Sequence, residues 1–179
     1  MSIIRRRIMP TPAFLTVIGK VQGLITKNAS SVESVSGASR TDHIDESMIQ
    51  ALSHEIISPY DRQSGSSTGP RIHGPLCLTK SFDSASPLLL QALVKGEELE
   101  KVEIRWYRMS GSKEEHYYTT TLEDAKIVAI KDYMPSCQDP GNSHFTHLQE
   151  VHFSYRDITW NHVAASTTGS DQWDKSKMD

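Results

Sequence analysis

The feature that most constrains the fold is a pair of β-type segments on either side of one short turn. In residues 99–109, Val102, Ile104 and Trp106 alternate with polar residues, which is the period-two pattern of a strand that buries one face. Residues 115–122 (EHYYTTTL) are aromatic and β-branched, and both kinds of residue favour strands. The intervening Ser-Gly-Ser-Lys at 110–113 is typical of a hairpin turn. The pattern predicts an antiparallel hairpin at the centre of a β-rich fold.

Further strands are predicted on both sides of this hairpin. Residues 13–25 are apolar and are interrupted by Gly19 and Gly23, so we expect a strand or hairpin arm with a bulge or turn at each glycine. Residues 125–133 form another β-type segment. Residues 71–82 alternate in polarity and predict a half-buried strand. Its apolar face would consist of Ile72, Leu76, Leu78 and Phe82.

Two segments are less regular. Residues 47–58 carry apolar residues that suit a helix or a strand, and their β-branched end favours a strand over the second half. In residues 145–160 the apolar parity changes between Phe153 and Ile158. A bulge near Arg156 or Asp157 would reconcile the two halves as one bent strand.

Residues 86–95 are predicted to form the helix of the fold. Ser86 suits the N-cap and Pro87 the first helical position, where a missing N–H costs nothing. Apolar residues follow at helical spacing up to Val94. Lys95 favours the negative end of the helix dipole, and Gly96 suits the left-handed position that ends a helix.

Many strands and one helix predict a mainly β fold, a closed or nearly closed β-barrel of two antiparallel sheets capped by the helix. Residues 9–162 would form this single domain. Residues 1–8 would be an N-terminal extension, because Met9-Pro10 resembles a second start, and residues 163–179 would be a polar, poorly ordered tail in which Trp173 could dock. Residues 27–47 lack periodicity and predict a long protruding loop.

Composition excludes several function classes. The chain has 179 residues and a net charge of −3, which gives no reason to expect nucleic-acid binding. No apolar run approaches the roughly 20 residues of a membrane span, and the basic N-terminus precedes no hydrophobic stretch typical of a secretory signal. The two cysteines, Cys77 and Cys137, form no CxxC motif, and free thiols are the expected state.

An ordered series of short motifs resembles the hemolysin-coregulated protein (Hcp) family of type VI secretion systems. The resemblance covers most of residues 9–174. Its pieces are Gly69-Pro70-Arg71-Ile72-His73, Ser86-Pro87-Leu88-Leu89, Ala92-Leu93, Gly96-Glu97, Trp106-Tyr107-Arg108, His116-Tyr117-Tyr118-Thr119-Thr120-Thr121-Leu122, Asp124-Ala125, Met134-Pro135, Cys137-Gln138-Asp139, Tyr155-Arg156, Ile158, Trp160, Gly169-Ser170-Asp171 and Trp173.

The resemblance implies a structural protein and not an enzyme. It implies hexameric rings that stack head to tail into a tube inside a contractile sheath, with a spike protein at the tip and effectors in the lumen. It also implies assembly in the bacterial cytoplasm followed by export without a cleaved signal peptide, and no cofactor or metal.

One region departs from the family pattern. Between Ser31 and Gln50 the family continues with an acidic stretch in a protruding loop that packs one ring on the next, and this chain matches it only in part. The residues that the resemblance assigns to ring stacking here are Arg40, Asp42, His43, Asp45 and Glu46.

Two alternatives to the tube subunit are a monomeric effector carrier or chaperone and a small β-barrel enzyme with a site near Cys137 and His147. His144, His147 and His152 follow Cys137, but this spacing matches no strong zinc pattern. His147 and His152 also have opposite strand parity, so they should point to opposite faces. Solvated histidines and a loop cysteine are therefore the favoured interpretation.

Overall fold

The computed structural model describes residues 11–173 and confirms the central hairpin. Strands β7 (Leu99–Ser110) and β8 (Lys113–Tyr133) pair antiparallel, with Ser110 opposite Lys113 and Gly111 at φ 66° in the turn. The sequence predicted two separate strands in residues 115–133, but β8 is continuous over 21 residues. It bends at Asp124, whose φ is 46°.

The strands form a ring of hydrogen bonds, as the predicted barrel requires. The others are β1 (Ala13–Gly19), β2 (Gly23–Leu24), β3 (Ser47–Ser53), β6 (Leu76–Ser81), β9 (Leu148–Ser154), β10 (Asp157–His162) and β11 (Thr167–Gln172). The sheet order is β11-β10-β8-β7-β1-β3-β6-β9, and β9 pairs back onto β8. The fold is mainly β and antiparallel. A separate two-stranded sheet joins β4 (Ile56–Ile57) to β5 (Ile72–His73).

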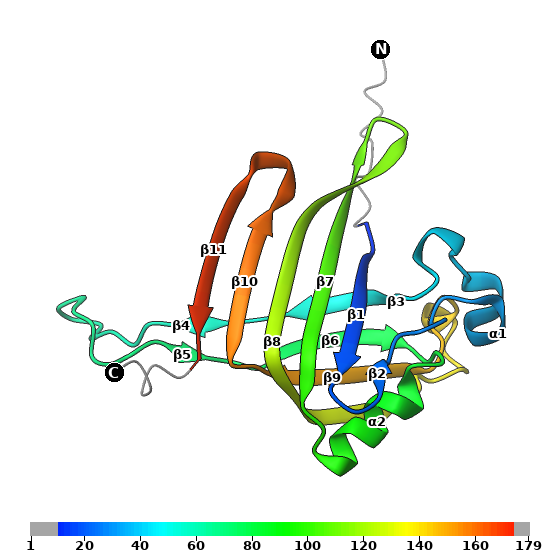
Figure 1. Cartoon of the computed structure of the whole chain (residues 1–179), viewed down its shortest axis with the longest axis horizontal. Coiled ribbons are helices and arrows are strands. Elements are labelled where there is room, and N and C mark those ends of the chain that lie inside the picture. The colour runs from blue at the N-terminus through cyan, green and yellow to red at the C-terminus, as the bar shows by residue number, and fades with distance from the viewer. Residues whose placement is uncertain (1–10, 174–179) are drawn as a thin grey trace.

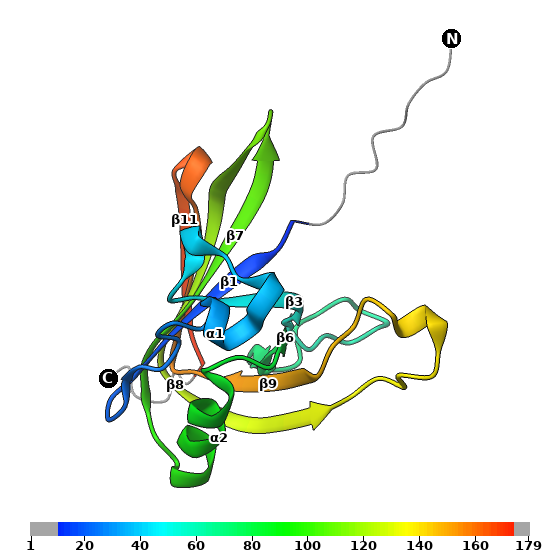
Figure 2. The ribbon, with the colours of Figure 1, turned by 90° about the vertical axis from the view of Figure 1, so that its right-hand side faces the viewer.

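The folded sheet has two layers that enclose the core. Strands β1, β7 and β8 cross over β3, β6 and β9 (Figures 1 and 2). Alternate side chains of both layers point inward, as the period-two patterns predicted. Fully buried members include Leu15, Val17, Leu78, Val102, Ile104, Leu122, Val151 and Phe153. Each of these contributes about 1.5–3 kcal/mol by burial relative to exposure.

The predicted helix is α2 (Ser86–Lys95). It buries Leu89 and Ala92 and packs against β8. Gly96 ends it in the left-handed conformation (φ 64°, ψ 33°), as expected. The N-cap is Ala85 and not Ser86, whose hydroxyl instead accepts a hydrogen bond from the N–H of Asp83.

The strand predicted over residues 71–82 is in fact two strands, β5 and β6, separated by Gly74-Pro75. The predicted face breaks there as well. Ile72 and Phe82 are exposed, whereas His73 is buried. In β6 the inward face includes Lys80, whose side chain is completely buried. Proline supplies no N–H to a ladder, so Pro75 disfavours a paired strand that continues across it.

The strand predicted in the second half of residues 47–58 lies mainly in the first half. The longer strand, β3, occupies Ser47–Ser53, while β4 contains two residues. β3 pairs with β1 at one end and with β6 at the other, and these tertiary partners decide what local propensity leaves open.

The expected change of parity before Ile158 is confirmed. Val151, Phe153 and Ile158 are all buried. The single bent strand over residues 145–160 is wrong, because β9 begins at Leu148 and β9 and β10 are separate strands divided at Tyr155 and Arg156. The sequence predicted a poorly ordered tail from residue 163. This is wrong for residues 167–172, which form β11 and pair along the whole of β10. Residues 1–8 and 174–179, expected to be an extension and the end of the tail, lie outside the described residues.

Residues 27–47 contain more structure than the predicted loop. A helical turn, α1 (Val32–Val35), is followed by 3-10 turns at Ser36–Ala38 and Thr41–His43. Ser30, His43 and Glu46 are buried. In the described part of the chain, no helix is long and apolar enough to span a membrane.

Candidate functional site

The segment of residues 27–47 is attached to the barrel by two of the residues predicted for ring stacking. His43 Nδ1 lies 2.5 Å from one carboxylate oxygen of Glu46, and Arg105 on β7 donates to the other at 2.9 Å. The His43 ring stacks on Phe14 of β1, with centroids 3.6 Å apart. His43 and Glu46 therefore anchor the segment and present little surface to another molecule.

The other three residues lie nearer the solvent. Arg40 forms an ion pair with Glu114 beside the β7–β8 turn, at 2.7 Å. Asp45 accepts a hydrogen bond from the backbone N–H of Asn28, and Asp42 is exposed. The structure thus brings the five predicted residues onto one segment but divides them into inward anchors and outward charges.

A second polar cluster fastens β11 to the rest of the molecule. Asp171 on β11 pairs with Arg71 and lies 3.1 Å from His73 Nε2. The Tyr155 hydroxyl lies between His73 Nδ1 at 2.8 Å and His54 Nε2 at 2.7 Å. With one proton, this hydroxyl donates to one ring and accepts from the other.

Burial and neighbouring charge shift the ionisation of this cluster. Burial and the Asp171 carboxylate raise the pKa of Tyr155, so the hydroxyl keeps its proton. Burial, followed by the charge of His73, lowers the pKa of His54. Burial opposes ionisation of Asp171, but hydrogen bonds from Arg71, the Gln172 backbone and His73 outweigh it and lower the pKa of that carboxyl.

A third cluster contains the less exposed of the two cysteines. Cys77 on β6 lies directly opposite His152 on β9, and Glu150 lies two residues away on the same face. The Cys77 sulfur is 3.4 Å from His152 Nε2, and a Glu150 oxygen is 2.8 Å from the same nitrogen. Burial, with the Glu150 charge, raises the pKa of the Cys77 thiol.

The alternative site near Cys137 and His147 is not formed. Both residues are exposed, and no hydrogen bond joins them in the described structure. His147 instead lies near Phe82, with ring centroids 6.0 Å apart. His147 lies just before β9, so the parity argument does not apply to it, and sequence spacing could not reveal Cys77, which is 75 residues from His152.

Comparison with known proteins defines the class of protein. The family model for "Type VI secretion system effector, Hcp" matches residues 22–162. The chain therefore belongs to the Hcp family of type VI secretion proteins.

Individual relatives agree with this assignment. The chain is 57% identical over 166 residues to the "Major exported protein" of Pseudomonas aeruginosa, covering 92% of this chain and 96% of the relative. A crystal structure of an Hcp protein has a TM-score of 0.88 at 44% identity, covering 92% of this chain and 98% of the other. The secreted protein Hcp3 from Pseudomonas aeruginosa has a TM-score of 0.78 at 49% identity, with 92% and 99% covered.

Proposed function

We propose that the chain is a tube subunit of the type VI secretion system, which assembles into hexameric rings that stack head to tail. A contracting sheath expels the tube, a spike protein caps it, and effectors travel in its lumen. The observation that carries this proposal is the 57% identity to an exported protein over nearly the full length of both chains.

The edge of the sheet is suited to self-association. β11 pairs with β10 on one side only within the described sheet, and residues 167–170 are exposed. Such an edge offers unpaired N–H and C=O groups to a strand of another chain. A head-to-tail contact of this kind, repeated from copy to copy, closes into a ring when its rotation permits.

Exposed apolar side chains supply a second surface. Val21 in the β1–β2 turn is 85% exposed and Val94 on α2 is 83% exposed. The Glu97 carboxylate accepts hydrogen bonds from the N–H groups of Val21 and Gln22, so it fastens this turn to the end of α2. A neighbouring copy that covered the two valines would gain about 1.5 kcal/mol or more from each.

Ring formation is tested by analytical ultracentrifugation and by electron microscopy of the purified protein. We expect particles with about six times the 20.1 kDa mass of one chain, visible as rings. Thr168→Lys places a charge on the β11 edge and should yield monomers, because charged edges resist strand pairing. Ser66→Lys, in the exposed loop between β4 and β5, is the control and should keep the rings.

Strictly monomeric protein over a wide range of concentration would contradict the ring. It would leave the monomeric effector carrier as the function to test next.

Stacking is a separate step with its own variant. Asp42 is exposed on the segment proposed to touch the next ring, whereas His43 and Glu46 are buried anchors. Asp42→Lys should therefore shorten or abolish tubes in electron micrographs while single rings persist. Tubes of unchanged length would remove Asp42 from the stacking surface.

A further inference from the structure

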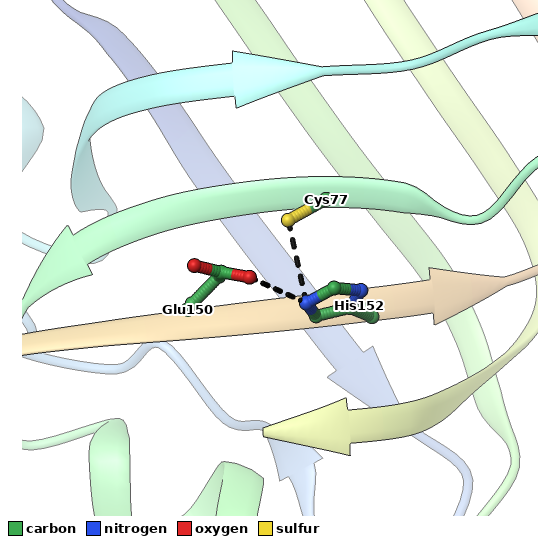
Figure 3. A group of neighbouring side chains, drawn as sticks. All are labelled: Cys77, Glu150 and His152. Carbon is green, nitrogen blue, oxygen red and sulfur yellow. Dashed lines mark hydrogen bonds and ion pairs between the residues drawn. The ribbon is translucent and has the colours of Figure 1, made fainter. Parts of the chain in front are cut away.

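Three electron-rich atoms converge on the outer face of the β6–β9 pair. The side chains of Cys77, Glu150 and His152 point toward one another from the two strands (Figure 3). The sulfur, a carboxylate oxygen and an imidazole nitrogen all lie within 4.8 Å of one another. Alternation explains the shared face: Leu76 and Leu78 point into the core, so Cys77 between them points outward.

Two electron-rich atoms, the Cys77 sulfur and a Glu150 carboxylate oxygen, lie around His152 Nε2. The thiol sulfur lies 3.4 Å away and the carboxylate oxygen 2.8 Å away. A neutral imidazole nitrogen carries at most one proton and an ionised carboxylate carries none. A bound cation would satisfy all three atoms at once, after the thiol gives up its proton.

The donor set and its spacing fit zinc. Thiolate, imidazole and carboxylate are its three usual protein ligands, with metal–ligand distances of roughly 2.0–2.3 Å in a tetrahedron. Tetrahedral geometry at those lengths separates the ligand atoms by about 3.3–3.7 Å. The sulfur–nitrogen separation of 3.4 Å already lies in this range, the oxygen–nitrogen separation of 2.8 Å would lengthen, and all three atoms lie within 4.8 Å of one another. Softer sulfur ligation also disfavours Mg²⁺ and Ca²⁺, which take oxygen ligands.

The strands on either side hold the ligands in place and leave one side open. Cys77 and His152 sit opposite each other in a continuous ladder, and β8 supports the far side of β9. The side chains of His152 and Glu150 are 27% and 29% exposed, so a fourth ligand can come from solvent. Three fixed protein ligands with an open fourth position are a recurrent form of zinc site.

We propose that Cys77, Glu150 and His152 bind one Zn²⁺ per chain on the outer face of β6 and β9, with water as the fourth ligand. The proposal concerns a single chain and does not depend on ring assembly.

Cobalt(II) titration of the reduced protein tests the proposal, because thiolate-bound cobalt gives a sulfur-to-cobalt charge-transfer absorption. We expect one cobalt per chain with this band, and displacement by Zn²⁺. Cys77→Ser should abolish the band, and Glu150→Gln and His152→Gln should each weaken binding at least about 10-fold. The exposed Cys137→Ser is the matched control and should titrate like the unchanged chain.

Circular dichroism confirms that each variant is folded before titration. Absence of the band in the unchanged protein would overturn the proposal and leave only hydrogen bonds among the three side chains. A band that persists in Cys77→Ser, or that disappears in Cys137→Ser, would also overturn it, since the sulfur would then come from the wrong cysteine.

Discussion

The indole of Trp173 stacks on the imidazole of His73, with centroids 5.6 Å apart and the planes inclined by 27°. Trp173 follows directly after β11, and His73 belongs to β5, so this contact joins two parts of the chain 100 residues apart. Tyr155 packs edge-on against the same indole at 4.9 Å. The aromatic contact and the Arg71–Asp171 ion pair together hold the outer strand of the sheet.

Replacing Trp173 should therefore loosen β11. We expect Trp173→Ala to lower the free energy of unfolding by about 1–2 kcal/mol, less than the 3–5 kcal/mol of a fully buried aromatic residue because the indole is only partly buried. Amide hydrogen exchange in residues 167–172 should accelerate. Phe145→Ala, at an exposed loop aromatic, serves as control; equal effects of the two substitutions would argue against a role in holding β11.

The network around Tyr155 should make stability depend on pH. The folded-state pKa of His54 is lowered from about 6.5, so folding favours the neutral ring. The corresponding stability is complete above pH about 6.5 and is lost as the pH falls through the folded-state pKa. Urea midpoints at pH 7.5 and 5.5 should differ less in His54→Gln than in the unchanged protein. His147→Gln, at an exposed histidine, should leave the difference as it was.

Lys80 offers a direct comparison of buried and exposed ion pairs. Its ammonium group is fully buried and lies 2.7 Å from Asp83, which is also buried. Lys80→Ala should cost about 3–5 kcal/mol in urea unfolding, because Asp83 is left as an uncompensated buried charge. Lys20→Ala removes the exposed pairs with Glu98 and Asp124 and should cost much less, because solvent screens exposed charges. Similar losses of unfolding free energy in the two variants would contradict the expected difference between buried and exposed ion pairs.

The end of α2 can be tested through its glycine. Gly96 has φ 64°, a left-handed conformation that strains any residue with a Cβ. Gly96→Ala should lower the free energy of unfolding by about 1 kcal/mol. Gly37→Ala meets open space at a position without positive φ and should change it by a few tenths at most. Thermal unfolding followed by circular dichroism distinguishes the two, and a neutral Gly96→Ala would contradict the strain.

The sequence predicts best where the signals are local. Helix α2 is recognisable because its proline, apolar stripe and terminal glycine lie within eleven residues, and the β7–β8 hairpin is recognisable from alternation around one turn. β11 carries no such signal. It has no apolar side chain, residues 167–170 are exposed, and the side-chain contacts that hold Asp171 come from Arg71 and His73, far away in the chain.

The candidate sites follow the same rule. His43 and Glu46 lie on the segment that the resemblance assigns to ring stacking. No neighbouring residue in the sequence indicates that His43 packs on Phe14 and that Glu46 pairs with Arg105, contacts that hold both side chains against the ring of strands. Cys137 is close in sequence to three histidines and contacts none of them by a hydrogen bond in the described structure. Cys77 meets His152 only because β6 and β9 become neighbours in the folded sheet. Register between distant strands is a tertiary property that single-strand patterns do not encode.

Strand β8 belongs both to the closed ring of strands and to the extension formed by β10 and β11. Residues 119–123 pair with β10, and residues 126–133 pair with β9 in the ring of strands. The β10–β11 extension is therefore joined to the ring in two ways, by its ladder bonds to β8 and by residues 155–156, which connect β10 to β9. Under tension along β8, the many ladder bonds to β7 are loaded together in shear, so this strand should resist mechanical extension strongly.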